Sequence, residues 1–236
     1  MNPVLRRSLR SLAAAGVRRL PRALLDAQAV NARIAQRAAP TTDPTANPAA
    51  DPAAELAAIA AEVSECSACS LCETRQNTVP GEGSTNARVM FIGEGPGADE
   101  DRSGRPFVGR AGKLLDDIIT KGMRLARDDV FIANVVKCRP PGNRDPTPAE
   151  SAACRPFLER QIAAVSPAVI CALGNTATHL LLENDLPMSR LRGQPHSWRG
   201  VPLVPTYHPA YLLREPAAKR LTWEDIQVVM RLASDA

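Results

Sequence analysis

The chain has 236 residues, 44% of them hydrophobic, with a formal net charge of +4 at pH 7 and six cysteines. This length allows one sizeable core, while the sequence has no apolar run long enough to span a membrane and too few cysteines for a disulfide scaffold. With no export signal either, we expect a cytoplasmic protein that does not associate with membranes.

Positive charge is concentrated at the N-terminus. Residues 1–40 contain eight arginines and one acid, a net charge of +7, which leaves −3 for residues 41–236. Leucines recur at roughly helical spacing, so residues 1–38 are predicted to be a basic extension, either helical or loosely ordered. Residues 39–54 hold four prolines and almost no large apolar side chains, which is typical of a linker. The folded domain is expected over residues 55–236, and its overall charge does not by itself indicate DNA binding.

Apolar runs alternate with helical patterns throughout this domain. Four short runs, rich in β-branched residues and bounded by Gly, Pro or Asn, are predicted as buried strands: 88–95, 130–138, 168–174 and 201–208. Four further segments have helical periodicity: 111–126, 147–165, 175–184 and 217–233. Thr147 and Glu150 form a capping box, with Pro148 at the first helical position. The alternation predicts an α/β fold, a single-domain three-layer sandwich around a mostly parallel four-stranded sheet.

Polar side chains occur where three of these strands end. Glu94 follows the first strand in GEGPG, Asn134 precedes KCRPPGNR at the second, and His208 follows the fourth in YHPAYLLR. Each alone has an ordinary explanation: an exposed acid, a turn former, or a histidine bonded to backbone. Because ligands of such folds bind at the carboxyl ends of the strands, we expect the three side chains to converge on one site.

Four motifs in order, GEGPGADED, GRPFVGRAGKLL, NVVKCRPPGNRDP and YHPAYLLR, lie downstream of a CxxC pair. Together they resemble the iron–sulfur-containing uracil-DNA glycosylases, family 4 of that superfamily. The resemblance covers about residues 60–232 and does not extend to residues 1–54. It implies the uracil-DNA glycosylase fold and a monofunctional enzyme that hydrolyses the N-glycosidic bond of uracil in DNA and leaves an abasic site. We expect it to act as a monomer. The alternatives are a non-catalytic iron–sulfur sensor of nucleic acids and a structural zinc module.

The resemblance gives four cysteines a role as ligands of a [4Fe-4S] cluster, which needs soft thiolates. The matching positions are Cys66, Cys69, Cys138 and Cys154. Cys72 extends the pair to C-x2-C-x2-C and is an alternative to one of the two nearer cysteines. Zinc bound by the same four sulfurs and a thioredoxin-like redox pair are the other possibilities. Cys171 is expected to be part of the core.

The resemblance also implies how the base is bound and cleaved from its sugar. Phe107 would stack on uracil, and Asn134 would donate to O4 and accept from N3–H, a pattern that cytosine reverses. His208 would bond the negative charge that develops on O2, helped by backbone N–H groups of Gly95 and Gly97.

An acid and a group of DNA-contacting residues complete the expected site. Glu94 would stabilise the sugar cation or position the attacking water, with Glu100 as the alternative. Tyr211 or Leu212 would fill the gap left by the flipped base. Residues expected to contact DNA are Lys137, Arg139, Arg144, Tyr211 and Arg214. The alternative for them is a solvated basic rim.

Overall fold

The structure is a computed structural model that describes residues 51–235. The predicted basic extension (residues 1–38) and residues 39–50 of the predicted linker (residues 39–54) lie outside the described residues. The described part begins with helix α3 (Pro52–Glu65), so residues 52–54, which we assigned to the linker, are helical instead. A proline can start a helix because the N–H that it lacks has no partner in the first turn.

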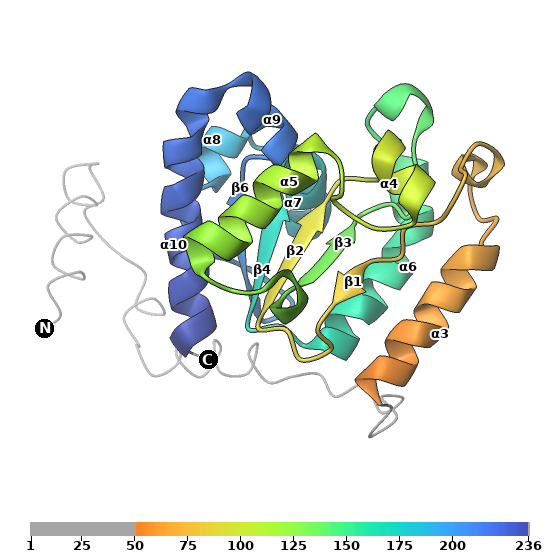
Figure 1. Ribbon diagram of the computed structural model, residues 1–236, viewed down its shortest axis with the longest axis horizontal. Coiled ribbons are helices and arrows are strands. Elements are labelled where there is room, and N and C mark those ends of the chain that lie inside the picture. The colour runs from red at the N-terminus through yellow and green to blue at the C-terminus, as the bar shows by residue number, and fades with distance from the viewer. Residues whose placement is uncertain (1–50, 236) are drawn as a thin grey trace, which may run out of the picture. The chain divides into compact units, whose positions relative to one another are not determined.

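A six-stranded sheet forms the middle layer of the fold (Figure 1). Its strands in chain order are β1 (Glu82–Gly83), β2 (Val89–Gly93), β3 (Phe131–Asn134), β4 (Val169–Leu173), β5 (His196–Trp198) and β6 (Val201–Thr206). Their order in the sheet is β1-β3-β2-β4-β6-β5, with the four inner strands parallel and the two edge strands antiparallel. The four predicted strands are thus confirmed. The sheet has six strands rather than four, because the two short edge strands β1 and β5 were not predicted from the sequence pattern.

Helices cover both faces of the sheet (Figure 1). After α3 they are α4 (Ala98–Ser103), α5 (Arg110–Asp117), α6 (Pro148–Val165), α7 (Asn175–Leu182), α8 (Met188–Leu191), α9 (Pro209–Arg214) and α10 (Lys219–Asp235). The buried clusters alternate along each strand: Met90 and Ile92 of β2 pack with α6 and α7, whereas Val89 and Phe91 pack with α5 and α10. The predicted three-layer α/β sandwich is therefore confirmed.

The predicted start of one helix, α6, is correct, whereas the predicted end of another helix, α5, is not. Thr147 and Glu150 cap each other at the start of α6: Thr147 Oγ1 accepts from Glu150 N (3.2 Å), and Glu150 Oε2 accepts from Thr147 N (2.7 Å). This confirms the capping box. The helix predicted for residues 111–126 is shorter, because α5 gives way to a π-helical segment at Ile118–Met123.

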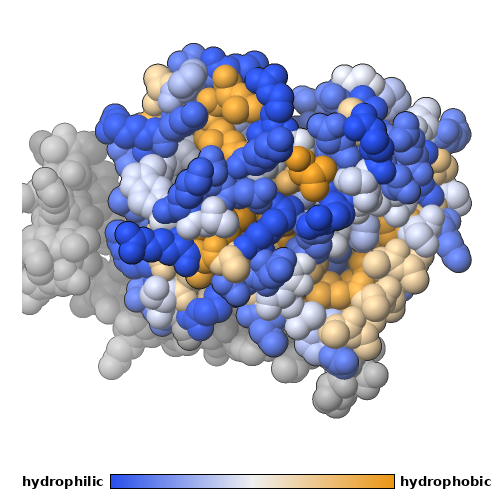
Figure 2. Space-filling view, in the orientation of Figure 1, coloured by the Kyte–Doolittle hydropathy of each residue, from blue (hydrophilic) through white to orange (hydrophobic). Residues whose placement is uncertain are grey.

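The face shown in Figure 2 is mostly hydrophilic. The region over α3, at the lower right, is weakly hydrophobic because most of the exposed side chains of this helix are alanines. Within residues 51–235, no helix combines the length and the apolar character that crossing a bilayer would require.

The register of the parallel strands aligns their carboxyl ends. Gly93 of β2 pairs with Asn134 of β3, and Leu173 of β4 pairs with Thr206 of β6. Residues that directly follow these pairs therefore emerge side by side at one edge of the sheet.

Candidate active site and cysteine cavity

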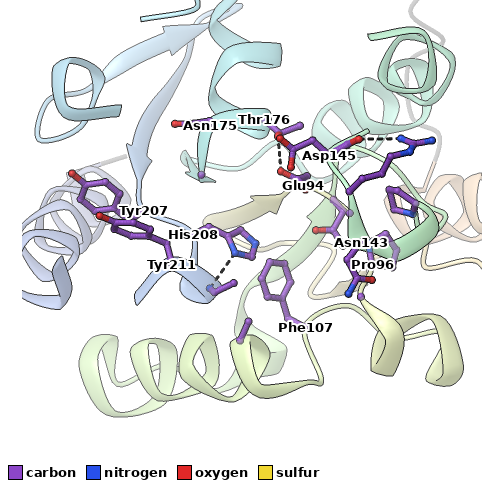
Figure 3. Close-up of a pocket in the computed structure, with 18 of the residues that line it drawn as sticks. Glu94, Pro96, Phe107, Asn143, Asp145, Asn175, Thr176, Tyr207, His208 and Tyr211 are labelled. Atoms are coloured by element: carbon purple, nitrogen blue, oxygen red, sulfur yellow. Dashed lines mark hydrogen bonds between the residues drawn. The ribbon is translucent and has the colours of Figure 1, made fainter. Parts of the chain in front are cut away.

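A cavity of about 780 Å³ opens at the carboxyl ends of β2, β3, β4 and β6 (Figure 3). We call it the strand-end cavity. Its lining includes Glu94, Phe107, Asn134, Thr176 and His208. The three polar residues expected to converge thus share one cavity with the expected stacking residue.

Asn134 presents an unpaired acceptor in this cavity. The residue is 1% exposed, and among residues 51–235 its Oδ1 has no hydrogen-bond partner. A buried polar atom without a partner is costly, so such an atom in a cavity indicates a place where a ligand donates. Gly93 makes room for it, because a Cβ there would lie 2.5 Å from both Asn134 Oδ1 and the Phe107 ring.

Phe107 is held against the cavity by an unusual backbone conformation. Its φ of 52° lies in the left-handed region, which is costly for a bulky residue. The conformation brings its backbone against Gly112, where a Cβ would lie 2.0 Å from the Phe107 carbonyl. The ring centroid lies 5.6 Å from that of His208, with the planes tilted by 33° (Figure 3). The phenyl ring is thus fixed beside the imidazole and is 6% exposed.

His208 is a neutral hydrogen-bond donor in this structure. It is the N-cap of α9, and its Nδ1 accepts from Ala210 N (3.1 Å; Figure 3), which assigns the ring proton to Nε2. Burial, followed by the positive charge of Arg214, lowers the pKa of His208 to about 4, against a small opposing effect of Glu100. At neutral pH the ring is therefore uncharged and has one N–H to donate.

Glu94 lies opposite, in contact with a hydroxyl. Thr176 Oγ1 donates to Glu94 Oε2 (2.5 Å; Figure 3). Burial raises the pKa of Glu94 above its ordinary value; the Thr176 bond opposes this, and the negative charge of Asp145 adds to it. Sequence reasoning gave no role to Thr176 or Asp145, although Thr176 follows a predicted strand and Asp145 lies within the NVVKCRPPGNRDP motif.

Glu100, the alternative acid, is engaged by backbone. Its Oε2 accepts from Gly97 N (3.0 Å), and its Oε1 accepts from Val108 N and Gly109 N (both 2.9 Å). The carboxylate therefore joins the start of α4 to the loop that carries the stacking phenyl ring. The Gly97 N–H is occupied by this bond, so our expectation that it contacts substrate is wrong for this conformation. The Gly95 N–H has no acceptor among the residues that the structure describes.

A second cavity is surrounded by thiols, and we call it the cysteine cavity. Five cysteines line it: Cys66, Cys69, Cys72, Cys138 and Cys154. All are free thiols. Cys171 is fully buried in β4 and belongs to the core, as expected.

Two N–H donors already point at sulfurs of the cysteine cavity. Arg75 Nη1 donates to Cys138 Sγ (3.2 Å), and Lys137 N donates to Cys154 Sγ (3.4 Å). Burial raises the pKa of both thiols, that of Cys154 to about 11, although the two donors act in the opposite direction. Each of these N–H donors would stabilise a thiolate that binds a metal centre, and thiolates are the donor set that an iron–sulfur centre requires.

The cysteine cavity brings together all four cysteines expected as ligands, and Cys72 stays as a possible fifth member of the set. Among residues 51–235, no three His, Cys, Asp or Glu side chains are grouped so that they could hold a single metal ion.

Lys137 was expected to contact DNA, and the structure corrects this. The side chain is 1% exposed, and Nζ donates to Asn134 O (2.8 Å) and Gln161 Oε1 (2.6 Å). Burial lowers its pKa to about 8. A lysine enclosed in this way cannot reach a phosphate. Leu212 was likewise expected as a gap filler, but it is 1% exposed and packs inside.

The other residues expected to contact DNA lie at or near the rim of the strand-end cavity. Arg144 is exposed and pairs with Glu150 through two bonds (2.7 and 2.8 Å). Arg139 Nε donates to Asn143 Oδ1 (2.7 Å). The exposed members that line the cavity itself are Arg144, Tyr211 and Arg214. Tyr211 and Arg214 are thus placed to meet a strand that enters the cavity, whereas Arg144 would meet it with its guanidinium already paired to Glu150.

Tyr211 stands at the end of an aromatic stack that sequence reasoning missed. Its ring lies 5.0 Å from that of Tyr207 (Figure 3). Arg192 lies over the Tyr207 ring, 5.9 Å from its centroid. Arg192 is held in turn by Asp225, which is fully buried (2.8 and 3.0 Å). Tyr211 therefore stacks on a ring that is itself held in place by Arg192 and Asp225.

Comparison with known proteins adds to this geometry. A sequence model of the Uracil DNA glycosylase superfamily matches residues 80–227. The Type-4 uracil-DNA glycosylase of Thermotoga maritima is 49% identical over 179 residues, which cover 73% of this chain and 92% of that protein. That of Sulfurisphaera tokodaii is 45% identical over 183 residues (74% and 83%), and that of Saccharolobus solfataricus 45% over 184 residues (75% and 85%).

Proposed function

Because the chain belongs to the type-4 uracil-DNA glycosylases, we propose that it excises uracil from DNA by hydrolysing the N-glycosidic bond, leaving an abasic site. The observation that carries this is the buried, unpaired Oδ1 of Asn134 in a cavity that also holds a phenyl ring and a neutral imidazole donor. These are the groups needed to bind a flat base with an N–H edge and to stabilise it as it departs.

Recognition of uracil follows from the hydrogen-bonding capacity of one amide. A base that leaves the duplex can enter the strand-end cavity and stack on Phe107. Asn134 Oδ1 then accepts from N3–H, and its NH₂ group donates to O4. Cytosine presents an acceptor at N3 and a donor at C4, so it would leave both groups of the amide unpaired.

Cleavage of the bond leaves negative charge on the base and positive charge on the sugar. His208 Nε2–H is the donor that we assign to the developing charge on O2. Because the pKa of His208 is about 4, the ring is neutral and acts by hydrogen bonding. Removal of one such donor typically costs about 3–4 kcal/mol of transition-state stabilisation. The Gly95 N–H is the second candidate donor.

Glu94 is the acid that we assign to the sugar and the attacking water. Its raised pKa lies nearer to neutrality than that of an ordinary carboxyl, which favours general-base action, and the Thr176 hydroxyl fixes its orientation. The carboxylate of Glu100 already accepts three backbone hydrogen bonds, which supports a role in holding the loop of Phe107.

No lysine lines the strand-end cavity among residues 51–235, so a Schiff-base lyase step lacks a nucleophile there. This supports a monofunctional enzyme. At the rim, the cavity-lining Arg144 and Arg214, with Arg139 nearby, are proposed to contact phosphates, and Tyr211 to stack in the gap left by the flipped base. A cytoplasmic monomer stays our expectation for its working form.

The cysteine cavity is proposed to hold a [4Fe-4S] cluster. Its ligands would be Cys66, Cys69, Cys138 and Cys154, with Cys72 as an alternative to one of the first two. When bound, such a cluster would supply a structural cross-link rather than a step of the hydrolysis. It would tie the segment after α3 to the loop after β3 and to α6.

Excision is tested with an oligonucleotide that carries a single uracil. After incubation with the purified protein, alkali cleaves the strand wherever the base is missing. We expect scission at uracil and none in matched strands with cytosine or thymine at that position. A protein that binds the strand but leaves it intact after alkali would instead be the non-catalytic sensor. Iron and sulfide in nearly equal amounts would support the cluster, and zinc in their place would contradict it.

A further inference from the structure

A buried lysine lies between the cysteine cavity and the residue that reads the base. Lys137 lines the cysteine cavity, and its backbone N–H donates to Cys154 Sγ (3.4 Å). Its Nζ donates to the backbone oxygen of Asn134 (2.8 Å). One residue therefore contacts both a proposed cluster ligand and the proposed base-recognition residue.

The contact with Asn134 fixes the end of a strand. Beyond β3 the chain is still bonded to β2, because Val135 N donates to Gly93 O (2.9 Å) and Val136 N to Glu94 O (3.1 Å). It then turns, and the lysine side chain folds back onto the carbonyl three residues earlier. The lysine thus holds the backbone carbonyl of Asn134, the residue whose side-chain amide lines the strand-end cavity.

The clamp is anchored to a third element. Nζ of Lys137 also donates to Gln161 Oε1 (2.6 Å), and Gln161 Nε2 donates to Pro80 O (2.7 Å). Gln161 lies in α6, the helix that also carries Cys154. The buried network therefore connects the end of β3, helix α6 and the segment before β1.

The lysine is buried with neutral acceptors. Lys137 is 1% exposed, and both acceptors of Nζ are uncharged oxygens. A buried ammonium group without hydrogen-bond partners is costly, so the bonds to Asn134 O and Gln161 Oε1 hold the side chain in this one place.

We propose that Lys137 is a positioning residue: its bonds to Asn134 O and Gln161 Oε1 hold Asn134 in register for the uracil edge. This rests on the proposed uracil excision. Because the backbone N–H of the same residue contacts Cys154 Sγ, Lys137 also links the proposed cluster site to base recognition.

The first test replaces the lysine by an apolar side chain of similar length, Lys137→Met. We expect the iron content, the visible absorption and the affinity for DNA with an abasic-site analogue to stay as in the wild type. The single-turnover rate of uracil excision should fall roughly 10- to 100-fold, the size of effect expected when a recognition group is displaced. Inhibition by free uracil should weaken by about tenfold for the same reason. Lys113→Met, which removes an exposed lysine on α5, is the matched control and should behave as the wild type.

A double-mutant cycle separates positioning from a general structural role. If Lys137 acts through Asn134, then Lys137→Met should have no further effect on the rate in an Asn134→Ala background. Equal effects in both backgrounds, or a wild-type rate for Lys137→Met with its iron intact, would overturn the proposal. The wild type in the same assay reports separately on uracil excision itself.

If Lys137→Met does not retain iron, a second variant tests whether Lys137 positions Asn134. Gln161→Met keeps the lysine and every cysteine but removes one acceptor of Nζ and has nearly the same shape. Its excision rate should fall, by less than for Lys137→Met, and the loss should vanish in the Asn134→Ala background. An unchanged rate in this variant would overturn the proposal as well.

Discussion

Removal of the His208 imidazole should lower the chemical rate and leave DNA affinity unchanged. The only ring N–H is on Nε2, because Nδ1 accepts from Ala210 N. With a pKa of about 4, about one molecule in a thousand carries a charged ring at pH 7, so the wild type works through a neutral donor. Loss of one donor to a developing anion costs about 3–4 kcal/mol, so His208→Ala should excise uracil roughly 100- to 1000-fold more slowly.

Single-turnover excision, quenched with alkali, measures this step without product release. His179→Ala is the matched control, since its ring is bonded to Leu186 O and does not line the strand-end cavity. Binding to DNA with an abasic-site analogue, measured by fluorescence anisotropy, should be the same for the wild type and both variants. A rate for His208→Ala close to that of the control would refute the assignment of the donor.

The same residue predicts a pH dependence of stability. The pKa of His208 is about 4 in the folded protein against an ordinary value of 6.5, so between these values the unfolded chain binds a proton that the folded chain does not. The neutral His208 therefore adds to the free energy of unfolding. This contribution is complete above about pH 6.5 and is lost as the pH falls towards 4. The difference between the two pKa values, at about 1.36 kcal/mol per unit, makes it about 3 kcal/mol. Urea unfolding of the wild type and His208→Ala should therefore differ less at pH 4 than at pH 7. A difference independent of pH would contradict the lowered pKa.

Four other substitutions test the remaining groups. Asn134→Asp should lower the ratio of uracil to cytosine excision by about 100-fold or more, because the edge pattern is no longer matched; an unchanged ratio would exclude the amide as the reader. Glu94→Gln should keep the bond from Thr176 but slow excision by about 100-fold, measured in single turnover, and wild-type activity would remove the acid from the mechanism. Cys138→Ala should yield less folded protein with less iron, whereas normal iron content would exclude Cys138 as a ligand. Arg75→Gln removes a positive charge and a donor at Cys138 Sγ, so voltammetry should show a lower reduction potential of the cluster. A tenfold shift in the reduction equilibrium corresponds to about 59 mV for one electron. An unchanged potential would show that this contact does not act on the cluster.

The sequence predicted those parts of the fold that have a strong periodic signal. The four inner strands are continuous apolar runs because both their faces are covered, and such runs are easily recognised. The edge strands are not, since β1 is only Glu82–Gly83 and owes its conformation to pairing with β3. Pairing with β3, rather than its own composition, makes it a strand.

Side chains whose role depends on distant partners were the hardest to foresee. Lysine is almost never buried without a partner, and the acceptor of Lys137, Gln161, lies 24 residues away in the chain. Nothing near Lys137 in the sequence therefore indicated that its side chain is buried. Glu100 did carry a signal: it is the third residue of a helix that begins after a glycine, the position from which a glutamate reaches back to cap the backbone. Thr176 could have been found by extending the strand-end rule to the third predicted strand.

The aligned ends of β3, β2, β4 and β6 carry the amide, the carboxylate, the hydroxyl and the imidazole on adjacent strands. Neighbouring strands lie about 4.8 Å apart, so these four groups are spread over about 14 Å at the edge of one hydrogen-bonded sheet. A sheet of this kind has no hinge between its strands. The protein has little freedom to reach towards its substrate, and the deformation must occur in the duplex. The strength with which uracil is paired and stacked then limits the rate at which it flips out of the duplex. A uracil in a wobble pair with guanine should therefore be excised faster than one paired with adenine.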